Sequence, residues 1–257
     1  METIEVSRGS GIVTVTLNRP AKKNAADAQM WSELLDTFRA VAAGDDRVMV
    51  LTGAGGDFCA GADLTGGGTG APGRHMLSQM RHVADVALAL HRIPIPTIAK
   101  VRGVAVGAGC NMALGCDLVV ASDNARFSEI FSRRGLSVDF GGSWVLPRIV
   151  GMHRAKELAL IADIIDASEA DRIGLVNRVL PDAEIDDFVA GWAARLAAGP
   201  PIALAMTKRM LDNSMQVTLE EALDDEGVAQ ALNFSTADTA EALRAFGEKR
   251  EPRFEGR

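Results

Sequence analysis

The sequence has little of what marks secreted, disulfide-bonded or membrane-spanning proteins. Its 257 residues include three cysteines, Cys59, Cys110 and Cys116, an odd number without C-x-x-C spacing. Neither a disulfide framework nor a structural zinc site is therefore predicted, and we expect buried thiols. The longest stretch without Asp, Glu, Lys or Arg runs over 14 residues, 103–116, which is too short to cross a bilayer. Its first residues, Met-Glu-Thr-Ile-Glu, lack the basic and apolar regions of a signal peptide, so a soluble cytoplasmic protein without membrane contact is expected.

An excess of positive charge is also missing. The formal net charge is -7, whereas binding to nucleic acid requires a net basic face, so no nucleic-acid partner is predicted. A small anionic ligand is still possible on an acidic protein, because nearby charges dominate over distant ones. The cluster Arg19, Lys22 and Lys23 is a candidate phosphate site, with a solvated turn as the equally good alternative.

The chain does contain ample apolar material, 47% of its residues, enough for a sizeable core. The pattern predicts a β-hairpin over 4–17, a helix over 28–43, a buried strand over 48–51, a helix over 76–91 and strands over 97–101 and 118–121. A small-residue helix should follow the glycines of 103–109. Strand and helix alternate, which indicates an α/β fold with at least partly parallel strands.

Beyond Asp182 the pattern becomes purely helical, with helices expected over 183–198, 200–213, 219–233 and 236–248. We therefore divide the chain into an α/β core, 1–195, and a helical region, 196–257. Such a series of helices must bury its apolar faces on the core or on another subunit, so a homo-oligomer is expected.

Two glycine-rich segments follow strands, Gly53 to Phe58, which continues into the small residues of 59–63, and Gly103 to Gly109. The first lacks the G-x-G-x-x-G spacing and the helix of a dinucleotide site, and the second lacks the Lys and Ser/Thr of a triphosphate-binding loop. Their small side chains would let a ligand approach backbone N–H groups, and two converging N–H groups would form an oxyanion hole. Ordinary tight loops are the alternative interpretation.

The segment from Ile98 to Leu118, IAKVRGVAVGAGCNMALGCDL, closely resembles the signature of the crotonase superfamily, the enoyl-CoA hydratases and isomerases. LNRP at 17–20, FCAGADL at 58–64, GGS at 141–143 and AFGEKR at 245–250 resemble further landmarks of that family, in the same order and at similar spacing. The resemblance thus extends over almost the whole chain.

The resemblance implies a spiral of ββα repeats with a C-terminal helical region that forms a homo-trimer or a dimer of trimers. It implies an acyl-CoA thioester substrate, whose oxygen would be held by the backbone N–H groups of Ala62 and Ala108. No metal or redox cofactor is implied, since CoA is part of the substrate. The glycine-rich segment 66–80 would line the acyl pocket. The positions that match CoA-contacting residues of the family are Lys22, Lys23, Ala60, Asp63, Leu64, Phe246 and Lys249.

The departures from the family pattern concern the acids. The positions of the two glutamates that hydratases of this family use are occupied here by Asn111 and Phe131, which we place in the acyl pocket. Asn is no base at neutral pH and Phe has no proton to donate, so the carboxylate pair that positions water is missing. Glu129, two residues from the second position, is a possible substitute.

Asp139 matches the position of the acid in isomerase branches of the family. Among Val138, Phe140 and Trp144 its pKa should be raised by desolvation, which suits a base that removes a carbon-bound proton. The alternative is a structural role as N-cap of the helix that follows Gly141. The same position is the nucleophile in the family's aroyl-CoA dehalogenases, but Phe131 stands where those enzymes have Trp.

The leading hypothesis is therefore an enoyl-CoA isomerase in which Asp139 moves the proton and Ala62 and Ala108 hold the oxygen. The alternatives are an enoyl-CoA hydratase with a non-standard site and an acyl-CoA-binding protein without catalytic activity, as the two missing glutamates would permit.

Overall fold

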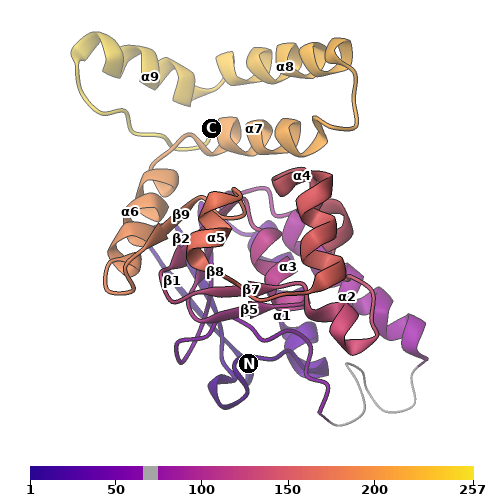
Figure 1. The fold of residues 1–257 in the computed structure, drawn as a ribbon. Helices are drawn as coiled ribbons and strands as arrows, with labels where there is room; N and C mark the ends of the chain where they lie inside the picture. The colour runs from indigo at the N-terminus through magenta and orange to yellow at the C-terminus, as the bar shows by residue number, and fades with distance from the viewer. Residues whose placement is uncertain (66–74) are drawn as a thin grey trace.

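A computed structural model describes residues 1–65 and 75–257, and its strands form two sheets (Figure 1). The larger sheet has the order β1-β2-β3-β4-β6-β9, with β1 antiparallel to β2 and all other neighbours parallel. The smaller sheet has the order β5-β7-β8. The predicted α/β class with partly parallel strands is confirmed. The strands are β1 (Ile4–Gly9), β2 (Ile12–Leu17), β3 (Val48–Gly53), β4 (Thr97–Val101), β5 (Val104–Val106), β6 (Leu118–Ser122), β7 (Arg126–Ser128), β8 (Ile165–Asp166) and β9 (Arg178–Leu180).

Helices cover both faces of the larger sheet. In β3 the alternate residues Met49 and Leu51 join the main core, whereas Val48 and Val50 pack against α6 on the opposite face. This explains the uninterrupted apolar run of β3, because both of its faces are buried. The described helices are α1 (Ala28–Ala42), α2 (Met76–His91), α3 (Ala108–Leu114), α4 (Gly142–Ile161), α5 (Ala167–Arg172), α6 (Ile185–Ala197), α7 (Pro201–Asn213), α8 (Leu219–Phe234) and α9 (Ala237–Glu248), with short 3-10 turns at Pro20–Lys22 and Ile130–Arg134.

The C-terminal helices form a separate layer. Figure 1 shows α7 above the core and α8 and α9 on the far side of α7. Their exposed apolar side chains include Leu219, Leu223, Val228, Phe234, Leu243 and Phe246. The predicted division of the chain at 195/196 falls near the end of α6, which packs on the sheet.

Two expectations about the chain's chemistry can be compared with the structure. All three cysteines are buried free thiols, as predicted. None of the described helices is by itself long and apolar enough to span a membrane. Only α6 and α7 taken together reach that length and composition, and they are bent by 106° relative to each other.

Candidate active site

Two loops at the carboxyl ends of parallel strands meet beside the start of α3. Cys59 N–H donates to the Val104 carbonyl at 2.9 Å, and Val106 N–H donates to the Cys59 carbonyl at 3.0 Å. Ala26 N–H donates to the Gly61 carbonyl, and Asp63 N–H donates to the Ala26 carbonyl, both at 2.8 Å. These bonds fix the backbone on either side of Ala62.

The amides of Ala62 and Ala108 are the ones that this network leaves unused. Within residues 1–65 and 75–257, neither N–H donates to a protein acceptor. Ala108 is the first residue of α3, where an N–H has no partner within the helix. Both amides therefore have the free donor that the predicted oxyanion hole requires.

Glycines make the close approach of these loops possible. A Cβ atom on Gly61 would lie 2.8 Å from the Val106 carbonyl oxygen and 3.7 Å from the Ala108 nitrogen. A Cβ atom on Gly109 would lie 2.3 Å from the Cys59 carbonyl oxygen. Gly61 also has a φ of +93°, which favours glycine. The loops that carry the two amides are thus in direct contact.

Asp139 lies in the segment between the 3-10 turn Ile130–Arg134 and α4, and it is held against α3. The side-chain amide of Asn111 donates to the Asp139 carbonyl at 2.9 Å. Asn111 is three residues after Ala108 on the same helix, about 4.5 Å along the axis. This hydrogen bond places the Asp139 main chain against the middle of α3, the helix that begins at Ala108.

The Asp139 carboxyl group has the environment of a base. Its Oδ1 atom is buried and accepts no hydrogen bond from the described residues, and burial raises its pKa to about 6. The N-cap alternative is wrong: Gly141 is the N-cap of α4, and no side chain caps it. Asp139 contributes only its carbonyl there, which accepts from Gly142 N–H at 3.0 Å.

The backbone after Asp139 is strained. Phe140 has a φ of +50°, an uncommon conformation for a bulky residue, and Gly141 follows with a φ of +81°. The Phe140 ring packs on Trp31 of α1, with ring centroids 5.6 Å apart. This contact with the core supports the turn that presents Asp139.

Asn111 and Phe131, the residues at the positions of the missing glutamates, are both buried. A Cβ atom on Gly107 would lie 3.6 Å from the Phe131 ring, so this ring covers the backbone next to Ala108. Asn111 also donates to Glu129 at 3.2 Å, and that carboxyl group is buried as well. Neither Asn111 nor Phe131 lines the large cavity described next, and their assignment to an acyl pocket remains a prediction.

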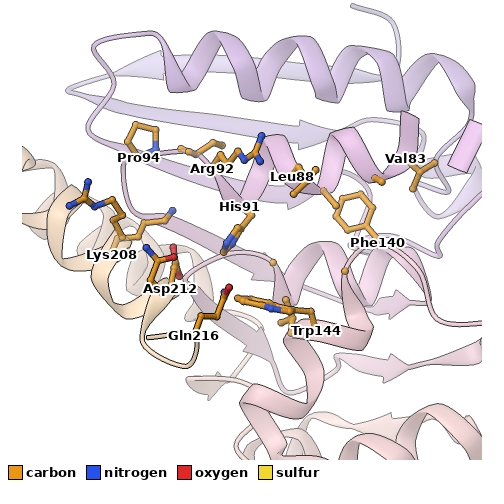
Figure 2. Close-up of a pocket in the computed structure, with 18 of the residues that line it drawn as sticks. Val83, Leu88, His91, Arg92, Pro94, Phe140, Trp144, Lys208, Asp212 and Gln216 are labelled. Atoms are coloured by element: carbon orange, nitrogen blue, oxygen red, sulfur yellow. The ribbon is translucent and has the colours of Figure 1, made fainter. Parts of the chain in front are cut away.

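A cavity of about 1100 Å³ opens beside Asp139. Figure 2 shows side chains of α2, of α7 and of the segment around Phe140 and Trp144 directed toward it. The part nearest Asp139 is largely apolar, whereas the α7 side carries Lys208 and Asp212. Of the predicted pocket segment 66–80, residues 66–74 lie outside the described residues and Met80 lines the cavity. The other lining residues include Val83, Ala84, Ala87, Leu88, His91, Val145, Met206 and Gln216.

The sequence analysis did not identify the side chains that α7 contributes to the wall of this cavity. Lys208 forms an ion pair of 2.8 Å with Asp117 and donates to the Ile95 carbonyl at 3.1 Å, which ties α7 to the core. His91 packs on Trp144, with ring centroids 5.3 Å apart. The spacing of Lys208 and Asp212 places them on one face of a helix, but sequence spacing does not reveal which element that face meets.

The predicted CoA-contacting positions of the core lie in two segments of the chain, 22–23 and 60–64. Three of them are exposed: Lys22, Lys23 and Leu64. Ala60 N–H donates to the Lys23 carbonyl at 2.9 Å, which joins the two segments. Asp63 is already paired with Arg19 at 2.9 Å. Hydrogen bonds from Thr65 and Arg19 hold its pKa at about 2. Asp63 therefore neutralises the guanidinium of Arg19, and Lys22 and Lys23 are the cations of this cluster with exposed side chains.

Phe246 and Lys249 belong to the outer helical layer. Phe246 on α9 is 86% exposed, and Lys249 is the left-handed C-cap of that helix. The layer stands apart from the core that carries Lys22 and Lys23 (Figure 1). Their contact with CoA, which the family resemblance places across subunits, stays a prediction. In the described ranges 1–65 and 75–257, no group of three or more His, Cys, Asp or Glu side chains is placed to hold a metal ion.

Comparison with known proteins identifies the family. The family model described as Enoyl-CoA hydratase/isomerase matches residues 7–257. The "Probable enoyl-CoA hydratase" of Rhodobacter capsulatus is 40% identical over 99% of this chain and 98% of its own length, and the 1,2-epoxyphenylacetyl-CoA isomerase of Escherichia coli is 37% identical over the whole of both chains. The crystal structure of an enoyl-CoA hydratase from Bacillus anthracis superposes over 100% of both chains with a TM-score of 0.94 at 31% identity. The chain therefore has the crotonase fold and belongs to the enoyl-CoA hydratase/isomerase family.

Proposed function

We propose that this enzyme is an enoyl-CoA isomerase that moves a proton between two carbons of the acyl group. The observation that carries the proposal is the Asp139 carboxyl group, buried at the wall of the cavity, with one oxygen that accepts no hydrogen bond from residues 1–65 and 75–257. One acid that can both remove and return a proton suffices for a 1,3-proton shift. The isomerase from Escherichia coli among the relatives supports this activity class.

The mechanism follows from the groups that are present. The N–H groups of Ala62 and Ala108 hold the thioester oxygen. The Asp139 carboxylate removes a proton from the α or γ carbon, and the electron pair of that C–H bond delocalises into a dienolate. The two amides stabilise the negative charge that develops on the oxygen. The carboxylic acid of Asp139 then returns the same proton two carbons away, which restores the carboxylate and leaves a shifted double bond.

The pKa of Asp139 suits both halves of this cycle. A carboxyl group with a pKa near 6 is largely ionised at neutral pH and can accept the proton. Its conjugate acid is also a weaker acid than an exposed aspartic acid, but strong enough to protonate a dienolate. The increase in pKa is caused by burial, which disfavours the charged carboxylate.

Hydration of a 2-enoyl-CoA is the second candidate, because a hydratase is named among the most similar relatives. Asn111 and Phe131 cannot activate water, so water addition would require Asp139 together with Glu129. The buried position of Glu129, behind Asn111, does not favour access to bulk water.

We also propose that the CoA phosphates bind near Lys22 and Lys23, and that the helical layer α7–α9 of one chain packs on another to form a trimer or a hexamer. The first proposal is supported by the exposed ammonium groups next to Ala60. The second is supported by the exposed apolar side chains of α8 and α9. Both are expectations of the family resemblance.

The test compares wild type with Asp139→Asn on a 3-enoyl-CoA and on a 2-enoyl-CoA, with separation of the isomers and of any 3-hydroxyacyl-CoA. We expect the wild type to shift the double bond without forming the hydroxy product. Asp139→Asn should lower kcat about 10²- to 10⁴-fold, the usual contribution of a general acid–base. Water addition by both proteins at similar rates would refute the proposal.

A further inference from the structure

Glu129 is a buried acid without a cation. It follows β7, its residue is 2% exposed, and its Oε1 atom accepts no hydrogen bond from the described residues. Burial raises its pKa to about 7, and the nearby Asp139 carboxylate acts in the same direction. The hydrogen bonds from Asn111 and from the Cys110 thiol oppose this increase. Within the described part of the chain, no ion pair forms at this carboxyl group.

Such a group is costly for the fold. Burying a carboxylate without a positive partner is unfavourable, and an apolar side chain of similar volume would usually serve the core better. The two titratable groups that face Glu129 are Cys110 from α3 and Asp139 from the segment before α4. Neither supplies positive charge. The contribution of Glu129 must therefore lie in what its hydrogen bonds position.

Asn111 links Glu129 to the site. Its Nδ2 atom lies 3.2 Å from Glu129 Oε2 and 2.9 Å from the Asp139 carbonyl oxygen. The two hydrogens of one amide thus serve both acceptors, so the carboxyl group of Glu129 determines which way the Asn111 amide is turned. If the amide turned over, its carbonyl oxygen would face two acceptor oxygens, which is repulsive.

Packing confines the Asn111 side chain on the side of α4. A Cβ atom on Gly142 would lie 2.3 Å from Asn111 Nδ2, so the side chain is pressed against the first turn of α4. The Asp139 segment is strained at Phe140, and a strained turn keeps its geometry only when its surroundings hold it. The hydrogen bond from Asn111 is one of the contacts that hold it.

We propose that Glu129 is a positioning residue for Asp139, acting through the side-chain amide of Asn111. Glu129 orients the amide, the amide holds the main chain of Asp139, and the Asp139 carboxyl group is thereby held at the cavity wall. This inference rests on the proposed role of Asp139 as the acid–base. Glu129 itself does not line the cavity and is not assigned a contact with substrate.

Two variants separate the hydrogen bond from the charge. Glu129→Gln keeps an oxygen that can accept from Asn111 but removes the ionisation. Glu129→Leu removes both. Glu33→Gln is the matched control, since Glu33 also accepts hydrogen bonds, from Glu2 N–H at 2.9 Å and from the Thr3 hydroxyl at 2.7 Å, and does not line the cavity. Each protein is assayed over pH 5 to 9 with a 3-enoyl-CoA, alongside Asp139→Asn.

We expect Glu129→Leu to lower kcat at least tenfold with KM within twofold of wild type, because substrate contacts are kept while the base is misplaced. Asn111→Leu should cause a similar loss, and Glu129→Leu combined with Asn111→Leu should be no worse than the more damaging single change. Wild type should show one inflection in kcat near pH 6, from Asp139, and a second near pH 7, from Glu129, and Glu129→Gln should lack only the second. Glu33→Gln should match wild type throughout.

The inference fails if folded Glu129→Leu and Glu129→Gln keep the wild-type kcat and pH profile while Asp139→Asn is inactive. If Glu129→Leu does not fold, the pH profile of Glu129→Gln decides between these results. Full activity of Asp139→Asn would instead refute the proposed function. A rise in KM with unchanged kcat would show that Glu129 affects binding, and would also overturn the positioning role.

Discussion

The contact between Gly142 and Asn111 allows a sharp test of how the site is built. Gly142 is the first residue of α4 and is buried. In Gly142→Ala, the added Cβ atom would lie 2.3 Å from Asn111 Nδ2, 2.4 Å from Oδ1 and 2.5 Å from Cγ. These distances are far below van der Waals contact, so the Asn111 side chain must move. It would then lose its hydrogen bonds to Asp139 and Glu129.

The size of the effect follows from these losses. Overpacking of a buried site costs about 1 to 3 kcal/mol, and each of the two lost hydrogen bonds adds about 1 kcal/mol, so we expect Gly142→Ala to lower the free energy of unfolding by roughly 3 to 5 kcal/mol. For a chain of this size the melting temperature should fall by roughly 6 to 20 °C. The kcat of the isomerisation should fall at least tenfold, because Asp139 loses its support.

The assay combines thermal unfolding with steady-state kinetics on a 3-enoyl-CoA. Gly191→Ala is the matched control, since it makes the same change inside helix α6 where nothing lies within 4 Å of the new atom. It should be neutral or stabilise by up to about 1 kcal/mol, as expected for glycine to alanine in a helix. Wild-type stability and kcat in Gly142→Ala would refute the packing that we describe around Asn111.

Three further predictions concern the oxyanion hole, the buried acid and the assembly. Gly61→Ala should lower kcat about 10²- to 10³-fold, because its Cβ atom would lie 2.8 Å from the Val106 oxygen and would push apart the loops that carry the two amides. Gly56→Ala is the control, since Gly56 also has a positive φ but no atom near its added Cβ, and it should keep the wild-type kcat. Equal losses in both variants would contradict the close approach of the two loops. The pKa of Glu129 is raised from 4.5 to about 7 in the folded chain. Wild type should therefore be most stable relative to Glu129→Gln below pH 4.5, where the carboxyl group is protonated, and should lose this relative stability as the pH rises through 7. Urea unfolding should show the difference between the two proteins changing by about 3 kcal/mol between pH 4.5 and 8, and a difference independent of pH would show that Glu129 titrates normally. Light scattering at micromolar concentration should give three or six times the mass of one chain, and a monomer would contradict the assembly expected from the exposed faces of α8 and α9.

Much of the fold was predictable because its signals are local. The helix over 76–91 ends where the sequence indicates, before Ile93-Pro94, and Pro200 and Pro201 mark the start of α7. The short strands β5, β7, β8 and β9 were missed, since two or three residues carry no periodicity. Their pairing depends on partners that are distant in the chain.

The candidate site was predictable where motifs carry it and not where packing does. Ala62, Ala108 and Asp139 stand in segments whose residues resemble a known family, and the structure brings those segments together. The relation of Glu129 to Asn111 and Asp139 depends on three separate elements meeting, which no spacing reveals. The cavity wall from α7 depends likewise on how the helical layer lies on the core.

The central claim is that the Asp139 carboxyl group carries the proton from one carbon to another. The most direct measurement is deuterium incorporation in deuterated water, followed by mass spectrometry of the acyl-CoA during turnover of a 3-enoyl-CoA by wild type and by Asp139→Asn. Wild type should shift the double bond with little deuterium in the product and without 3-hydroxyacyl-CoA, because Asp139 returns the proton that it removed, and Asp139→Asn should not shift the double bond. Isomerisation that persists at the wild-type rate in Asp139→Asn, or full incorporation of solvent deuterium by wild type, would contradict the account.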